Sequence, residues 1–136
     1  MKKIRFEELG SQRMFALPEL QARADRNPLD EKRKQYRVWF GDDEVAFLTF
    51  DIFLPDELNV YEIFVAKKYR RQGVGSEVIR FAADLGRFMC KKRLSIWARP
   101  LSDQSQEDLI AWYVRRGLKP TEDDHERLLM DLSERD

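Results

Sequence analysis

A change of hydrophobic period in the middle of the chain constrains the fold more than any other feature. Residues 59–66 are rich in valine, tyrosine, isoleucine and phenylalanine and predict a buried strand. Beyond a short basic segment, Val78, Ala82, Leu85 and Met89 recur at the spacing of one helix face and predict an amphipathic helix. A strand that passes through a tight turn into a helix is typical of a mixed α/β domain.

Further strands and one further helix are expected on both sides of this unit. Ile4 and Phe6 alternate with charged neighbours and predict a short first strand, and two β-rich runs around a Gly-Asp turn predict a hairpin of residues 36–40 and 44–50. Downstream we expect a strand at 94–98, a helix that carries Leu109, Trp112 and Tyr113, and a last strand at 126–132. The expected order is an antiparallel meander followed by helix, strand, helix and strand, within a single domain of residues 1–136.

The segment between residues 11 and 34 is polar and mixed. Met14, Leu17, Leu20 and Ala24 lie at roughly helical spacing, which predicts a helix that the Asn27-Pro28 step ends.

The composition excludes several classes of function. The chain carries 25 Lys plus Arg and 25 Asp plus Glu, a net charge of zero, whereas a general nucleic-acid binder usually has a basic excess. One cysteine, Cys90, and one histidine, His125, supply neither an internal disulfide nor a metal site of the usual spacing, so no metal is expected. The first residues lack the apolar run of a signal peptide and no stretch approaches a membrane span, which predicts a cytoplasmic protein without membrane contact.

The basic segment between the strand and the helix has the features of a phosphate-binding turn. Gly73 and Gly75 allow the main chain to approach a ligand closely, and the first turn of a helix offers amide groups without internal partners. Arg70 and Arg71 can add charge-assisted contacts. A P-loop would need a lysine after its last glycine, where this chain has Ser76, and a dinucleotide fold would need a different glycine spacing. The alternative is a plain basic connection in which the glycines only permit the turn.

Two sequence blocks resemble the GNAT superfamily of N-acetyltransferases. The family signature of Gln or Arg, two residues, Gly, one residue, and Gly or Ala at a strand–helix junction is matched by Arg70-Arg71-Gln72-Gly73-Val74-Gly75. The second block, residues 110–118 (IAWYVRRGL), is similar to the aromatic-Tyr-three residues-Gly-apolar end of the family's fourth helix. The resemblance covers residues 36–132 well and the N-terminal part weakly.

The resemblance implies a fold and a donor substrate. The fold would be a mixed, mostly antiparallel central sheet with a V-shaped splay between the fourth and fifth strands, at 59–66 and 94–98, flanked by helices. Acetyl-CoA would lie in the V as acetyl donor and pair with the fourth strand. The residues implied in binding it are Ile63, Phe64 and Val65 beside the thioester, Arg70, Arg71, Gln72, Gly73, Val74, Gly75 and Ser76 around the pyrophosphate, and Gln106, which stands where relatives often carry an asparagine.

The resemblance also implies direct transfer of the acetyl group to a primary amine in a ternary complex. Tyr113 matches the tyrosine that assists the departing thiolate, because a nearby O–H donor favours its release. Glu62 is the candidate base or substrate contact, and a water chain is the alternative. Relatives often have the acidic residue one place earlier, where this chain has Tyr61, and a one-residue shift on a strand changes the face.

The sequence leaves the acceptor and two other functions open. The acceptor could be a polyamine-like, amino-sugar or amino-acid amine, a protein lysine or N-terminus, or a charged tRNA; otherwise no nucleic-acid partner is expected. Acidic loop residues expected to edge the acceptor side weakly favour a cationic acceptor, although solvated loop charge explains them equally well: Asp56, Glu57, Glu122, Asp123 and Asp124. The alternatives are a non-catalytic GNAT-like module that binds acyl-CoA or docks a partner, and a nucleic-acid binder that uses the cluster at 67–71. Because dimers are common in the family, a homodimer is a further expectation.

Overall fold

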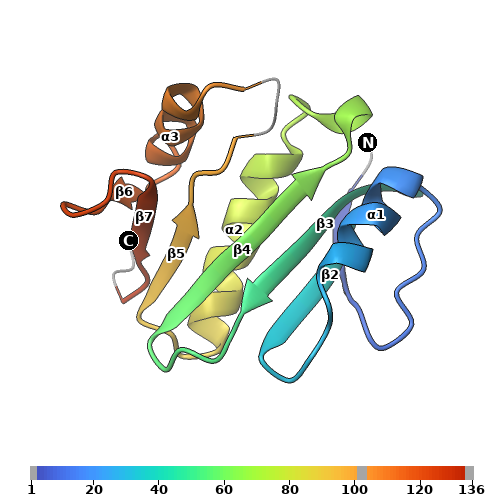
Figure 1. The fold of residues 1–136 in the computed structure, drawn as a ribbon, viewed down its shortest axis with the longest axis horizontal. Helices are drawn as coiled ribbons and strands as arrows, with labels where there is room; N and C mark the ends of the chain where they lie inside the picture. The colour runs from blue at the N-terminus through green and yellow to red at the C-terminus, as the bar shows by residue number, and fades with distance from the viewer. Residues whose placement is uncertain (1–2, 101–103, 134–136) are drawn as a thin grey trace.

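A single sheet in the order β1-β2-β3-β4-β5-β7-β6 organises the structure, a computed structural model that describes residues 3–100 and 104–133 (Figure 1). The strands are β1 (Ile4–Glu8), β2 (Arg33–Phe40), β3 (Asp43–Asp51), β4 (Glu57–Val65), β5 (Arg93–Trp97), β6 (Lys119–Pro120) and β7 (Arg127–Asp131). The helices are α1 (Pro18–Arg26), a 3₁₀ turn η1 (Lys67–Tyr69), α2 (Val74–Phe88) and α3 (Gln106–Val114). The mixed α/β fold and the antiparallel meander of β1 to β4 confirm the sequence prediction.

Strands β4 and β5 form the one parallel pair among the strands described, and they are paired over only part of their length. The pairing runs from Glu57 opposite Arg93 to Val60 opposite Ile96, after which the strands separate into a V (Figure 1). The predicted splay is therefore confirmed. Because residues 61–65 have β3 on one edge only, the other edge of β4 faces the V.

The closed end of the V is held by a polar cluster around Glu57. Its carboxylate accepts hydrogen bonds from Ser95 Oγ at 2.6 Å, Arg127 Nη2 at 2.9 Å and Arg93 Nε at 3.1 Å. Burial raises the pKa of Glu57, but these hydrogen bonds outweigh it and hold the pKa below its usual value. The cluster therefore stabilises the fold at neutral pH, and this contribution is lost as pH falls through the lowered pKa.

Helices cover both faces of the sheet, and each face has its own hydrophobic core. Residues of α2 such as Val78 and Ala82 are fully buried against β3, β4 and β5. On the opposite face, Leu20 and Ala24 of α1 pack with Phe47 and Phe64. Along β4, Phe64 therefore belongs to the α1 face, whereas Ile63 and Val65 pack on the α2 side.

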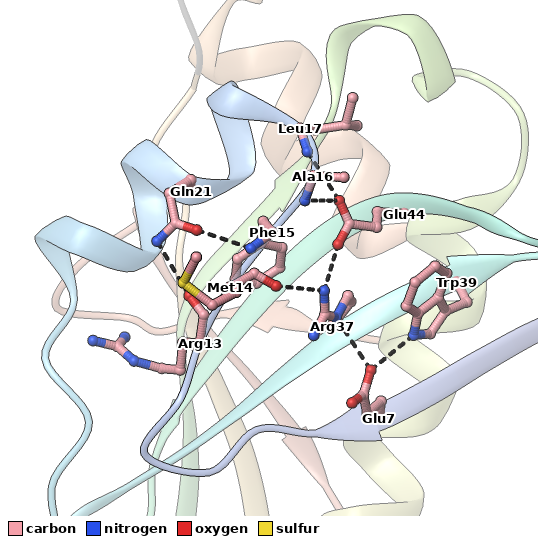
Figure 2. A network of polar contacts seen from close by, with 10 residues as sticks. All are labelled: Glu7, Arg13, Met14, Phe15, Ala16, Leu17, Gln21, Arg37, Trp39 and Glu44. Carbon is pink, nitrogen blue, oxygen red and sulfur yellow. Dashed lines mark hydrogen bonds and ion pairs between the residues drawn. The ribbon is translucent and has the colours of Figure 1, made fainter.

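A buried carboxylate anchors the segment that leads into α1 (Figure 2). Glu44 on β3 is only 6% exposed and accepts hydrogen bonds from the backbone of Ala16 at 2.7 Å and Leu17 at 3.0 Å. Its other oxygen pairs with Arg37, which also donates to the Met14 carbonyl. Since these contacts fix the start of α1, they also fix which residues α1 presents to the sheet.

The structure corrects the sequence prediction in the N-terminal region. The helix begins at Pro18, so Met14 is not helical, and its side chain is 75% exposed. The physical reason is that Pro18 occupies a first-turn position and residues before it hydrogen-bond to Glu44 and Arg37 instead of continuing a helix. The sequence pattern predicted neither the turn η1 nor the short strand β6.

Candidate functional site

The predicted phosphate turn is a strand–turn–helix junction whose backbone has two left-handed residues within three positions. Arg71 has φ of 65° and Gly73 has φ of 84°, and Gly73 immediately precedes α2. A non-glycine residue in this region is strained by about 1–2 kcal/mol, and such strain concentrates at functional sites. No side chain caps α2 at Gly73, and a Cβ built on Gly73 would meet no atom within 4 Å. The first amides of α2 therefore face open space, which suits an anion.

The two sequence blocks lie against each other in space. A Cβ on Gly75 would come within 3.0 Å of Trp112 Cη2 and Cζ2, so only glycine permits this approach of α2 to α3. Arg116 donates from Nε to Ser76 Oγ at 2.9 Å, and its Cζ lies 3.6 Å from the centre of the Trp112 ring. The second block thus supports the turn from behind and adds a guanidinium group beside it.

A cavity of about 500 Å³, which we name the turn pocket, extends from this turn along the open edge of β4. Ile63 and Val65 form its β4 wall, and Trp112 and Tyr113 form its α3 wall. Ala66 N–H donates to Val45 on β3, whereas the Val65 carbonyl accepts from Arg70 Nε at 3.0 Å. Because backbone groups of successive strand residues alternate between the two edges, Ile63 and Val65 present theirs to the V.

A second cavity of about 600 Å³, the α1 pocket, lies where α1 meets β4 and the end of β5. Its wall includes Glu62, whose Oε2 is 2.6 Å from Arg23 Nη1 and whose Oε1 accepts from Asn27 Nδ2 at 3.0 Å. Tyr61 also lines this pocket. Thr49 pairs with Glu62 and Phe50 with Val60, so Tyr61 is the extra residue of a β-bulge. The bulge lies in the part of β4 that lines this pocket.

The two pockets meet at four residues that line both: Ile63, Arg70, Arg99 and Tyr113. Tyr113 is 7% exposed, and its ring lies edge-on to Trp112 with centroids 5.3 Å apart. Burial raises the pKa of Tyr113 to about 12. Within the described part of the chain its hydroxyl forms no hydrogen bond, so the O–H can donate to a ligand at the junction.

The other predicted site residues are placed as follows. Arg71, Gly73, Gly75 and Ser76 line the turn pocket. Phe64 is 6% exposed and its side chain lines the α1 pocket, and Val74 is buried in the core at 1% exposed. Gln72 donates to the Lys68 carbonyl at 3.1 Å, and Gln106 donates to the Ala98 carbonyl at 3.2 Å, so each side chain braces its own loop.

Several residues of the two pockets had no place in the sequence-based site. Arg23 and Arg26 come from α1 and Asn27 directly follows it, in a segment whose sequence carries no motif. Arg99 follows β5 and reaches both pockets. The acidic residues expected to edge the acceptor side, Asp56, Glu57, Glu122, Asp123 and Asp124, all lie in the described ranges and line neither pocket. Glu57 is instead bound at the closed end of the V.

The described residues hold neither a metal-binding cluster nor a membrane-spanning helix. In residues 3–100 and 104–133, no cluster of three or more His, Cys, Asp or Glu side chains could hold a metal ion. Over the same ranges, no helix combines the length and apolar character needed to cross a membrane.

Comparison with solved structures agrees with the fold. The chain resembles a GNAT acetyltransferase from Elizabethkingia anophelis with acetyl-CoA bound, at 14% identity and a TM-score of 0.69, with 94% of this chain and 97% of that chain covered. It also resembles the ribosomal-protein-S18-alanine N-acetyltransferase of Escherichia coli, at 20% identity and a TM-score of 0.68, with 98% and 97% covered. An acetyltransferase of Bacillus subtilis in complex with CoA matches at 16% identity and a TM-score of 0.66, with 95% and 99% covered.

Sequence comparison gives the family directly. A search of curated protein sequences returns no significant match. The family model described as "Acetyltransferase (GNAT) family" matches residues 4–118, which include β1, the phosphate turn and both sequence blocks. The chain therefore belongs to the GNAT acetyltransferase family.

Proposed function

We propose that this protein is an N-acetyltransferase that binds acetyl-CoA in the turn pocket and transfers the acetyl group to a primary amine in the α1 pocket. The observation that carries the proposal is that the two pockets meet at a buried tyrosine, with an anion-binding turn at the far end of one of them. Direct transfer needs donor and acceptor bound together, and two joined cavities provide for that.

The residues of the turn pocket fit the donor. The first amides of α2 face open space beside Gly73, and Arg71, Arg115 and Arg116 line the same cavity, so a diphosphate would be held by main chain and guanidinium groups. The backbone of Ile63 and Val65 would pair with the extended pantetheine arm as an added strand. One N–H of this edge would polarise the thioester carbonyl.

At the junction, the chain's own groups would assist each part of the reaction. The acceptor ammonium loses a proton to Glu62 or to water, and its nitrogen forms a bond to the acetyl carbon. The C–S bond then breaks and releases the CoA thiolate, and the nitrogen loses its second proton to the thiolate or to water, which leaves the neutral amide. Glu62 lines the α1 pocket and could take that proton directly or through water. Tyr113 would donate its O–H to the sulfur as negative charge develops there.

The raised pKa of Tyr113 defines the form of this assistance. A free thiol has a pKa of about 8.5, so a thiolate is a much weaker base than the phenolate of a tyrosine whose pKa is about 12. Complete proton transfer from Tyr113 to the sulfur would therefore be unfavourable. Tyr113 would instead stabilise the leaving thiolate through a hydrogen bond and remain protonated throughout the cycle.

The test is acetyl-CoA turnover with a panel of primary amines, measured as thiol release and as formation of the acetylated amine by mass spectrometry. We expect amine-dependent thiol release well above a control without acceptor. Tight binding of CoA without turnover of any amine would instead indicate the non-catalytic acyl-CoA-binding module, and absence of CoA binding would contradict both functions.

A further inference from the structure

We propose that the acceptor amine also carries an acidic group, a carboxylate or a phosphate, which arginines of the α1 pocket bind. This inference rests on the proposed function and names the class of its acceptor.

The charged lining of the α1 pocket is one-sided. Among the described residues that line it, Arg23, Arg26, Arg70 and Arg99 stand against a single carboxylate, Glu62. The whole chain has a net charge of zero, so this positive excess is local to the pocket. A concave site with one sign of charge concentrates ligands of the opposite sign and repels those of its own. The positive charge of this pocket would therefore repel a polyamine.

The carboxylate of Glu62 already has a basic partner within the protein. Glu62 pairs with Arg23 at 2.6 Å and accepts from Asn27 at 3.0 Å, and Arg23 Cζ lies 4.4 Å from the centre of the Phe64 ring. Among the described residues, no ion pair involves Arg26 or Arg99. The pocket therefore offers two guanidinium groups whose charge is not balanced by any carboxylate of residues 3–100 and 104–133.

One of these groups is held at the wall by an aromatic ring. Arg99 Cζ lies 5.5 Å from the centre of the Tyr61 ring, and Tyr61 is the bulged residue of β4. Stacking on a ring leaves the N–H edge of a guanidinium group available, and that edge binds carboxylate or phosphate with two parallel hydrogen bonds.

The acetyl donor does not account for all of this charge. Arg70 and Arg99 line both pockets and can also contact phosphates of the donor, but Arg23 and Arg26 line only the α1 pocket. Both lie in the last turn of α1, where a basic side chain also interacts favourably with the helix dipole. If Arg26 had only a structural role, its substitution would change the stability of the protein and leave the preference among acceptors unchanged.

The experiment compares amines that differ only in the acidic group. The pairs are alanine with alaninamide, which tests a carboxylate, and O-phosphoethanolamine with ethanolamine, which tests a phosphate; spermidine is the cationic probe. For each amine, kcat/KM is corrected for the fraction of free amine at the assay pH. We expect the acid-bearing member of at least one pair to be preferred by about tenfold to hundredfold, the effect of one or two charge-assisted hydrogen bonds.

Variants connect the preference to the pocket. Arg26→Gln and Arg99→Gln should each reduce the preference for the acid, and Arg26→Glu should reverse it towards spermidine. The matched control is Arg80→Gln, because Arg80 is exposed on α2 and lines neither pocket. The KM for acetyl-CoA and the unfolding temperature of each variant separate an acceptor effect from a donor or structural effect.

A binding measurement keeps this inference separate from the proposed function. Calorimetry of each amine against the protein–CoA complex reports acceptor binding without turnover. Acid-selective binding that depends on Arg26 would support the inference even if no amine were acetylated. Equal or better use or binding of the neutral member in both pairs, or of spermidine, or a preference that Arg26→Gln and Arg99→Gln leave unchanged, would overturn it while amine turnover itself stood.

Discussion

The turn pocket and the α1 pocket share four wall residues but are built by different means. The turn pocket combines main-chain features, namely a left-handed turn, the start of α2 and the open edge of β4, with residues of α3 such as Trp112 and Tyr113. The α1 pocket is formed by side chains from α1, β4 and the end of β5, which are far apart in sequence. A main-chain site requires particular backbone conformations and so leaves a glycine pattern in the sequence, whereas a side-chain site leaves none. This difference predicts that the two pockets respond separately to substitution.

The largest effect is expected at Gly73. Gly73→Asp places a carboxylate where the diphosphate would sit, and like-charge repulsion should reduce CoA affinity by about 10³-fold or more. Gly73→Asn is the matched control, since asparagine also tolerates positive φ and has nearly the same size without the charge. Calorimetry with CoA measures both variants. If the two lose affinity equally, the loss comes from the backbone and not from the charge.

Removal of the Tyr113 hydroxyl tests the junction. Tyr113→Phe should lower kcat by about 10²-fold and leave CoA affinity nearly unchanged, because it removes a donor used only as the thiolate departs. Retention of full turnover would place this assistance elsewhere. Since burial raises the pKa of Tyr113 to about 12, the wild-type pH–rate profile should show no loss of activity from this group below pH 10.

The same pKa has a consequence for stability. The raised pKa favours the neutral phenol in the folded state. The contribution of Tyr113 burial to the free energy of unfolding is therefore fully present below the ordinary pKa of 10, and it is lost as pH rises from 10 to about 12. The alkaline unfolding transition of Tyr113→Phe should therefore be less steep than that of the wild type.

Substitution of Glu62 tests the base on the α1 side. Glu62→Gln keeps the size and the contact with Asn27 but loses the charge, and we expect kcat/KM to fall by about tenfold to hundredfold with a changed acidic limb of the pH–rate profile. Arg23→Gln is the matched control, because it removes the ion pair and leaves the carboxylate. A pH–rate profile that stays the same in Glu62→Gln would exclude it as the base in favour of a water chain.

The smallest effect is expected at Glu44, far from both reacting groups. Glu44→Gln removes the charge that pairs with Arg37 and weakens the contacts to the backbone of Ala16 and Leu17, which should lower the free energy of unfolding by about 1–3 kcal/mol. Because these contacts position α1, the KM for the acceptor should rise while CoA affinity is kept (Figure 2). A parallel loss of CoA affinity would show that the two pockets are not independent.

The sequence predicted the elements and the turn because each has a local physical cause. The β-rich runs of β2 and β3, the helix face of α2 and the Gly73–Gly75 spacing follow from residue propensity, hydrophobic period and backbone freedom. The start of α1 was not predictable from Met14 and Leu17, because long-range hydrogen bonds to Glu44 decide where that helix begins. The role of Tyr61 was likewise hidden, since the bulge depends on the register between β3 and β4.

By itself the sequence determined the family, most of the order of the elements and the position of the glycine-containing turn before α2, because a turn that requires positive φ favours glycine. Only the tertiary structure showed that Arg26, Glu62 and Arg99 line one pocket. It also placed Glu57 at the closed end of the V, bound to Ser95. The physical reason is that the charge of a pocket is a sum over side chains from separate elements, and no local segment carries that sum.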